Sequence, residues 1–306
     1  MKIIIRKERW NKMSFIVEGI IPALVTPFDT DFKLNEVGLR QLIRFVLKAG
    51  VHGIFVCGNA GEFYALSDKE KKRVFEIALE EVGEKATVYA GTGAITTKEV
   101  LKLTEMASSI GIKAVSIITP YFISLNEIEM FNHYQQIALH SRIPILVYNN
   151  PARTSNNISV RLAVQMAKLD NIIGMKDSSG DISLTTEIIR SVPPDFKILM
   201  GRDNLIYPSL VYGSAGAITS CANFAPQIAM DIYNFYKQGD HANALKAQHR
   251  FTDLRKAFRL GSFPSVIKEA LQILGIPAGP PRPPVQPLFE QTRNELKNLL
   301  REAGLI

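Results

Sequence analysis

The pattern that most constrains this chain is a repeated alternation of short apolar runs with longer amphipathic stretches. The short runs are rich in Ile, Val, Ala and Gly, which is typical of strands buried on both faces of a parallel sheet. We predict eight such strands, at residues 20–25, 53–57, 87–91, 114–118, 145–148, 172–176, 197–200 and 216–219.

Each predicted strand is followed by a stretch with helical periodicity. These helices are expected at residues 35–48, 67–83, 97–110, 125–140, 160–169, 184–191, 204–212 and 225–237. Ser67 and Glu70 form a capping-box pattern, and Gly50 and Gly111 stand where helices should end. Eight β/α units predict an α/β fold of the TIM (β/α)8 barrel type over residues 19–237, since such barrels take roughly 250 residues. A doubly wound open sheet is the alternative, but no GxGxxG motif follows the first strand.

The two ends of the chain depart from this alternation. We predict that residues 1–18 are an N-terminal extension, with Met13 as the expected natural start. Beyond residue 238 only helical patterns occur, at residues 242–260, 264–274 and 290–302, with a Pro-rich segment at 277–284. Because residues 238–306 lack a core-sized pattern of their own, we predict a C-terminal helical extension packed on the barrel.

Charge and cysteine content exclude several classes of function. The formal net charge is +7, but basic residues are mixed with acidic ones on helices, as at residues 68–73, so we expect no nucleic-acid partner. No apolar run approaches the length of a membrane span, so we expect no membrane partner. Cys57 and Cys221 make no disulfide framework, which favours a reducing cytoplasm. The five histidines show no ligand spacing, so no metal is expected.

The reactive groups of TIM barrels lie at the carboxyl ends of the strands, where this sequence places Lys176 and Tyr148 on neighbouring strands. Burial lowers the pKa of a lysine and yields the neutral amine that attacks carbonyls to form a Schiff base. A phenol beside that amine can give and take back the proton of the carbinolamine. The structural alternatives are a lysine that reaches solvent and a tyrosine that plugs the barrel.

The end of the second predicted strand offers a carboxylate site. Two glycines and consecutive backbone N–H groups suit an anion there, although an ordinary strand-to-helix turn is the alternative; the residues are Gly58, Asn59, Ala60 and Gly61. Glu62 follows them, and we favour a structural role for it. Arg153 offers a planar fork for a second carboxylate, or is a surface arginine.

Together these motifs resemble the dihydrodipicolinate synthase / N-acetylneuraminate lyase family of pyruvate-dependent class I aldolases, over residues 19–288. The resemblance rests on residues 22–28, 58–62, 148–151 and 174–177. It implies that Lys176 forms an imine with pyruvate or another 2-oxo acid, that Tyr148 shuttles protons, and that residues 58–61 hold the pyruvyl carboxylate. Gly201 and Ile218 match positions that line the pyruvate site.

The resemblance also sets expectations about cofactors and partners. The family needs no metal or organic cofactor, since the imine with the substrate supplies the chemistry. Its members are usually homotetramers built as a dimer of dimers. The substrates would be a small 2-oxo acid and an aldehyde.

The choice of aldehyde is where this sequence departs from subfamily patterns. The turn hydroxyls of the synthases are replaced by Asn59 and Ala60, and a tyrosine contributed by a neighbouring subunit is replaced by Phe122. The turn and residues 223–226 look more like 2-keto-3-deoxy sugar-acid aldolases, which we favour. Arg153 matches the synthase arginine that binds aspartate semialdehyde, so a 4-hydroxy-tetrahydrodipicolinate synthase is the alternative.

Two further classes of function are to be weighed against an active aldolase. A catalytically degenerate barrel that binds a 2-oxo acid is the second alternative, motivated by the missing hydroxyls. A phosphate-binding isomerase would want a glycine-rich loop after the seventh or eighth strand, and residues 213–216 precede the eighth instead. The histidines of a lysine-inhibited synthase are absent after the turn, and Ile95 replaces a polar residue of that regulatory site, so no feedback by lysine is predicted.

Overall fold

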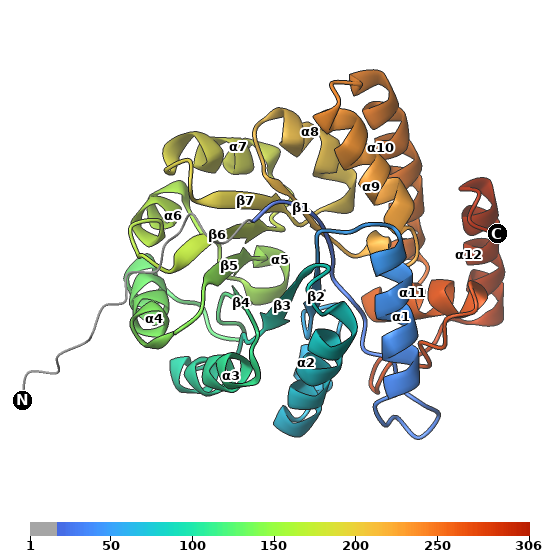
Figure 1. Ribbon diagram of the computed structural model, residues 1–306, viewed down its shortest axis with the longest axis horizontal. Coiled ribbons are helices and arrows are strands. Elements are labelled where there is room, and N and C mark those ends of the chain that lie inside the picture. Colours follow the sequence, from blue (N-terminus) through green and yellow to red (C-terminus); the bar gives the residue numbers. More distant parts are fainter. Residues whose placement is uncertain (1–16) are drawn as a thin grey trace, which may run out of the picture.

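A computed structural model describes residues 17–306, and a barrel of parallel strands lies at its centre (Figure 1). The sheet order is β1-β8-β7-β6-β5-β4-β3-β2, so strands that follow one another in sequence are neighbours, as in a TIM barrel. The strands are β1 (Gly19–Pro22), β2 (Gly53–Val56), β3 (Thr87–Gly91), β4 (Ala114–Ile118), β5 (Ile145–Asn149), β6 (Ile172–Asp177), β7 (Lys197–Met200) and β8 (Gly216–Thr219). The predicted fold class and all eight predicted strands are confirmed.

The first strand is shorter than predicted, and its end closes the barrel. The Ala23 N–H still donates to the Thr219 carbonyl of β8 at 2.8 Å, but residues 24 and 25 leave the β1–β8 ladder because their backbone groups bond to separate partners. The Leu24 N–H donates to the Phe55 carbonyl at 2.8 Å, next to an isolated bridge between Ala23 and Phe55. The Val25 N–H donates to the Asn223 side chain at 3.0 Å. The prediction of a strand through residue 25 was therefore wrong at its carboxyl end.

Helices surround the barrel, as Figure 1 shows. They are α1 (Glu36–Lys48), α2 (Asp68–Val82), α3 (Thr97–Ile110), α4 (Glu127–His140), α6 (Val160–Met166), α7 (Ile182–Ser191), α8 (Ile206–Val211) and α9 (Pro226–Lys237). The capping box of Ser67 and Glu70 is formed, and Gly111 ends α3 in the left-handed conformation, as predicted. The helix α5 (Pro151–Thr154) was not predicted; it is a single turn that starts on a proline just after β5.

Three further helices follow the barrel: α10 (His241–Lys256), α11 (Phe263–Ile273) and α12 (Glu290–Glu302). The predicted helix at 242–260 ends earlier, because residues 257–259 form a 3-10 turn. Most of α11 is buried on all sides, since every residue from 264 to 271 is buried and Val266, Ile267 and Ala270 are fully inaccessible. The proposed division of the barrel from its extension at residue 238 stays a proposal. The predicted extension at residues 1–18, with Met13, falls almost wholly outside the described residues.

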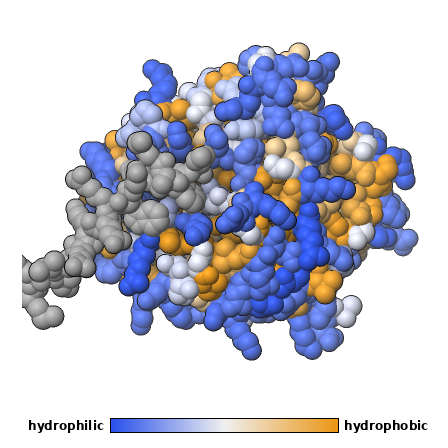
Figure 2. Space-filling model, in the orientation of Figure 1, coloured by the Kyte–Doolittle hydropathy of each residue, from blue (hydrophilic) through white to orange (hydrophobic). Residues whose placement is uncertain are grey.

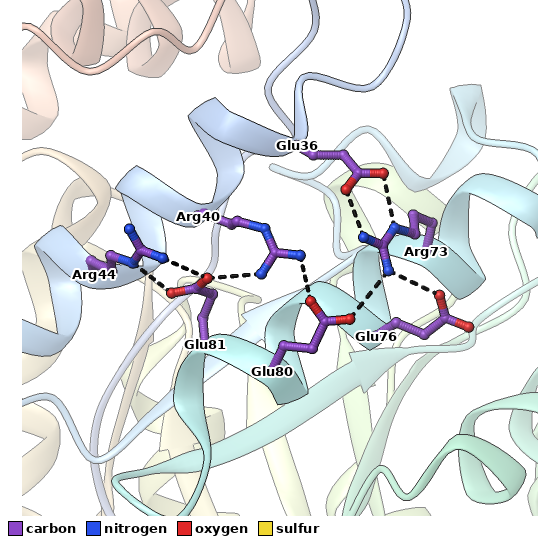
Figure 3. Close-up of polar contacts among 7 residues, drawn as sticks. All are labelled: Glu36, Arg40, Arg44, Arg73, Glu76, Glu80 and Glu81. Carbon is purple, nitrogen blue, oxygen red and sulfur yellow. Dashed lines mark hydrogen bonds and ion pairs between the residues drawn. The ribbon is translucent and has the colours of Figure 1, made fainter.

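An ion-pair network joins α1 to α2, beside β2 (Figure 3). Arg44 contacts both oxygens of Glu81 at 2.6 and 2.9 Å, and Arg73 contacts both oxygens of Glu36 at 2.8 and 2.6 Å. Arg40 connects the two pairs by contacting Glu81 and Glu80. Exposed pairs contribute little singly, but a network of two-pronged contacts orients two helices more firmly.

The molecular surface is mixed in character. Figure 2 shows hydrophilic side chains over much of one face, with apolar side chains between them, as expected of amphipathic helices around a buried barrel. None of the helices among residues 17–306 has the length and apolar character needed to cross a membrane.

Candidate active site

Lys176 and Tyr148 lie side by side at the carboxyl ends of β6 and β5, where they are paired in register. The Lys176 Nζ atom lies 4.0 Å from the centre of the Tyr148 ring and 4.9 Å from that of Phe55. Lys176 is only 4% exposed. This burial lowers the pKa of Lys176, although Tyr148 and Asp203 act in the opposite direction. The neutral amine is therefore more accessible here than on an exposed lysine.

The hydroxyl of Tyr148 is fixed by its neighbours. The Asn150 Nδ2 atom donates a hydrogen bond to the Tyr148 Oη at 2.9 Å. Because the oxygen accepts this bond, its own proton points elsewhere and can be donated to a substrate atom. The predicted pairing of a phenol with a buried amine is thus present in the geometry.

A cavity of about 170 Å³ opens above Lys176 at the carboxyl ends of the strands. Six of the nine predicted site residues line it: Lys176, Tyr148, Asn59, Ala60, Arg153 and Gly201. Gly201 must be glycine, because a Cβ there would lie 1.9 Å from the Ser178 Oγ.

The other three predicted residues do not line this cavity. Gly58 borders a small adjacent hollow, and Gly61 offers its carbonyl to the Thr26 hydroxyl at 2.7 Å. Ile218 is buried within β8. These three residues therefore support the residues that line the cavity and do not line it themselves.

Several lining residues were missed by the sequence analysis. Asn150, Ser178, Asp203 and Ser220 follow strands β5 to β8, where the strand-end rule points, but no motif in the sequence assigned them a role. Arg255 is different, because it belongs to α10, in the C-terminal extension. An arginine among the other charges of that helix gives no sequence signal.

A second cavity, of about 610 Å³, adjoins the first. Asn59, Arg153, Arg255 and Phe263 line both.

Comparison with known proteins identifies the family. Residues 16–303 match the model of the Dihydrodipicolinate synthetase family. The chain belongs to this family.

Relatives and solved structures agree with this. The 4-hydroxy-tetrahydrodipicolinate synthase of Methanopyrus kandleri is 36% identical over 96% of this chain and 99% of its own, and that of Methanospirillum hungatei is 38% identical over 92% and 98%. The crystal structure of YagE from E. coli K12, a family member in complex with pyruvate, superimposes with a TM-score of 0.92 at 32% identity, covering 95% of this chain and 100% of that one. This chain is therefore a pyruvate-dependent class I lyase of the dihydrodipicolinate synthetase family.

Phe122 stands where the resemblance places the tyrosine that synthases contribute from a neighbouring subunit. Its side chain is 92% exposed, and its backbone has a φ of 77°, which is unusual for a residue with a side chain. Phe122 lines neither of the two cavities of its own chain. The expectation that this position reaches a neighbouring subunit stays a prediction.

The turn that holds Asn59 and Ala60 is anchored from below by a buried ion pair. Glu62 is fully buried, and its Oε1 atom lies 2.6 Å from the Lys268 Nζ of α11. The Arg282 N–H donates to the Glu62 Oε2 at 2.9 Å, and the Lys268 Nζ donates to the Pro280 carbonyl at 3.0 Å. The C-terminal extension thus fixes the turn. Glu62 has the structural role that the sequence favoured, and Lys268 is its partner.

Replacing Lys268 by methionine is expected to lower the free energy of unfolding by about 3–5 kcal/mol, because the Glu62 carboxylate then stays buried without its partner. Burial lowers the pKa of Lys268 to about 8, against 10.5 for a free lysine. The unfolded chain therefore binds more protons between these values, and the stability contributed by this site rises with pH across that window.

Urea denaturation at pH 7 measures the loss. The variant Lys268→Met/Glu62→Gln removes both charges and should recover most of it. Equal instability of the single and double variants would show that the ion pair is not the cause.

The residues at 17–306 contain no group of three or more His, Cys, Asp or Glu side chains able to hold a metal ion. That no metal or organic cofactor is needed remains an expectation.

Proposed function

We propose that this chain condenses pyruvate with aspartate semialdehyde through an imine on Lys176, as a 4-hydroxy-tetrahydrodipicolinate synthase does. The observation that carries the choice is Arg153, which lines both the Lys176 cavity and the larger one beyond it. A guanidinium there suits the carboxylate of the semialdehyde. The archaeal relatives named above bear the same activity in their names.

The proposed chemistry starts at the Lys176 amine. It attacks C2 of pyruvate, and the resulting carbinolamine loses water to give the imine. Tyr148 donates the proton that leaves with the water and later takes one back. Loss of a proton from C3 gives the enamine, whose carbon attacks the aldehyde carbon while the aldehyde oxygen is protonated.

The pyruvyl carboxylate needs donors close to Lys176. Asn59 and Ala60 line the cavity, and the backbone N–H groups of their turn are the proposed donors. Backbone donors survive any change of side chain, so the loss of the turn hydroxyls does not remove this part of the site. The ion pair of Glu62 and Lys268 keeps the turn in place.

A 2-keto-3-deoxy sugar-acid aldolase is the second candidate. It was favoured from the sequence, and Asn59, Ala60 and Phe122 still support it because they replace relay hydroxyls of the synthases. The family assignment fits both activities, and the names of the relatives now favour the synthase.

Steady-state assays with purified protein separate the candidates. The synthase predicts consumption of pyruvate that depends on aspartate semialdehyde. The aldolase predicts release of pyruvate from 2-keto-3-deoxygluconate or a related acid. A degenerate barrel predicts trapping of the pyruvate imine without turnover of any aldehyde or sugar acid.

L-Lysine is expected not to inhibit the enzyme, because Tyr64, Ala65 and Leu66 stand where a lysine-inhibited synthase carries histidines, and Ile95 replaces a polar residue. Initial rates should be unchanged across a titration to millimolar L-lysine. A fall in rate at sub-millimolar lysine would show a regulatory site that the sequence comparison overlooked.

We further propose a cytoplasmic homotetramer, a dimer of dimers. The exposed Phe122 and the two buried free thiols, Cys57 and Cys221, support this. Light scattering coupled to gel filtration tests the assembly.

A further inference from the structure

Two guanidinium groups face the same pair of cavities from different parts of the fold. Arg153 lies on α5, after β5, and Arg255 lies on α10, in the C-terminal extension. Both line the cavity above Lys176 and the larger cavity beyond it. The barrel and its extension therefore each bring one permanent positive charge to the space where the second substrate enters.

Among the described residues, the Arg255 guanidinium pairs with a charged group only through its Nε edge. Its Nε atom lies 3.5 Å from the Asp203 Oδ2, and its guanidinium lies 4.3 Å from the centre of the Phe258 ring. The same carboxylate accepts bonds from the Ser220 N–H at 3.0 Å and from the Thr219 hydroxyl. Asp203 is thus fixed by the backbone after β8 and in turn fixes Arg255.

The terminal nitrogens of Arg255 remain available to a ligand. No hydrogen bond among residues 17–306 uses them, and the side chain is 26% exposed. The Arg153 guanidinium likewise makes no hydrogen bond to any residue in the described part of the chain. Each group therefore presents unused donors to the shared space.

Among the described residues, the lining of the two cavities gives these donors no acidic partner apart from Asp203. The larger cavity has no Asp or Glu in its described lining. In the smaller cavity Asp203 is the acidic residue, against Lys176, Arg153, Arg202 and Arg255. An excess of fixed positive charge around a small space favours an anionic ligand.

We propose that Arg255 is a specificity-determining residue that, together with Arg153, binds one anionic group of the aldehyde partner. The substrate class is an aldehyde that carries a carboxylate or a phosphate. This inference rests on the proposed imine chemistry at Lys176 and extends it, because an uncharged aldehyde such as glyceraldehyde leaves both guanidinium groups without a partner.

The test compares Arg255→Ala with wild-type protein on three aldehydes: aspartate semialdehyde, glyceraldehyde 3-phosphate and glyceraldehyde. These three aldehydes carry a carboxylate, a phosphate and no anionic group, respectively. The anion that Arg255 prefers is the one carried by the aldehyde whose kcat/KM falls more in the variant. The expected loss for that aldehyde is roughly 10- to 100-fold, as for removal of a charge-assisted contact. The kcat/KM for glyceraldehyde should hardly change. Lys256→Ala is the matched control, because it removes a positive charge from the same helix outside both cavities.

Three results would overturn the proposal. One is an equal loss for charged and uncharged aldehydes, and another is no loss for any. The third is weaker borohydride trapping of pyruvate alone in Arg255→Ala, which would mean that Arg255 acts on Lys176 through Asp203. In the Arg153→Ala/Arg255→Ala variant the losses should be less than multiplicative, because both groups bind one anion; multiplicative losses would contradict this.

A binding measurement separates failure of this proposal from failure of the proposed function. Calorimetry with glutarate, a dicarboxylate without a carbonyl to react, needs no turnover. Wild-type protein should bind glutarate more tightly than Arg255→Ala by a similar factor. If pyruvate is not trapped on Lys176 the proposed function fails, whereas equal glutarate affinities would overturn the anion site alone.

Discussion

Replacing Lys176 by alanine is expected to lower the turnover of pyruvate with any aldehyde by four orders of magnitude or more, on the order of losses seen when a covalent nucleophile is removed. The amine is buried at the end of β6, within 4.0 Å of the Tyr148 ring centre, and no other lysine among the described residues lines its cavity. Steady-state kinetics with purified variant measure the loss.

Lys176→Arg is the informative control. It keeps the positive charge but offers no nucleophilic amine at neutral pH, so it should be as inactive as alanine. Activity retained in Lys176→Arg would show that the charge, and not the imine, carries the reaction.

The pH dependence of imine formation follows from the same burial. Because the pKa of Lys176 lies below its ordinary value of 10.5, the neutral amine becomes the major form at a lower pH than for a free lysine. The rate of imine formation should therefore rise with pH and level off below pH 10.5. A rate that keeps rising through that value would contradict the lowered pKa.

Replacing Tyr148 by phenylalanine is expected to lower kcat by roughly 10²- to 10⁴-fold, the usual contribution of a general acid–base group. The substitution keeps the ring beside the Lys176 amine and removes only the hydroxyl, which Asn150 orients. The loss therefore reports proton transfer. Because this sequence lacks the relay hydroxyls at Asn59, Ala60 and Phe122, no side-chain hydroxyl at those positions substitutes for it.

Tyr121→Phe provides the matched control. Tyr121 lines the larger cavity but not the one above Lys176, so its hydroxyl should contribute little to imine formation. Equal losses in the two variants would argue that the cavity wall, and not the proton shuttle, limits the rate.

The barrel could be predicted from the sequence because its strands are short, apolar and regularly spaced. Runs such as residues 145–148 and 172–176 predict neighbouring strands, and neighbouring strands bring Tyr148 and Lys176 together. The first strand was predicted too long, because Leu24 and Val25 are as apolar as ladder residues, yet their N–H groups donate to Phe55 and Asn223 instead. Apolar character predicts burial, and it does not show which partner a backbone group will find.

The part of the site that comes from the C-terminal extension could not be predicted. Arg255 reaches the cavity from α10, and Lys268 reaches Glu62 from α11 across about 200 residues of sequence. Helical periodicity shows which face is buried but not what it is buried against. Lys268 lies within a stretch of α11 that is buried on all sides, although a lysine in the sequence would ordinarily count against burial.

Borohydride reduction in the presence of pyruvate tests the central claim most directly. If Lys176 forms an imine with pyruvate, reduction should inactivate the enzyme, and mass spectrometry of peptides should find the reduced pyruvyl adduct on Lys176. Omitting pyruvate, or using Lys176→Ala, should leave no adduct there. An enzyme that turns over pyruvate yet carries no adduct on Lys176, or carries it on another lysine, would contradict the account.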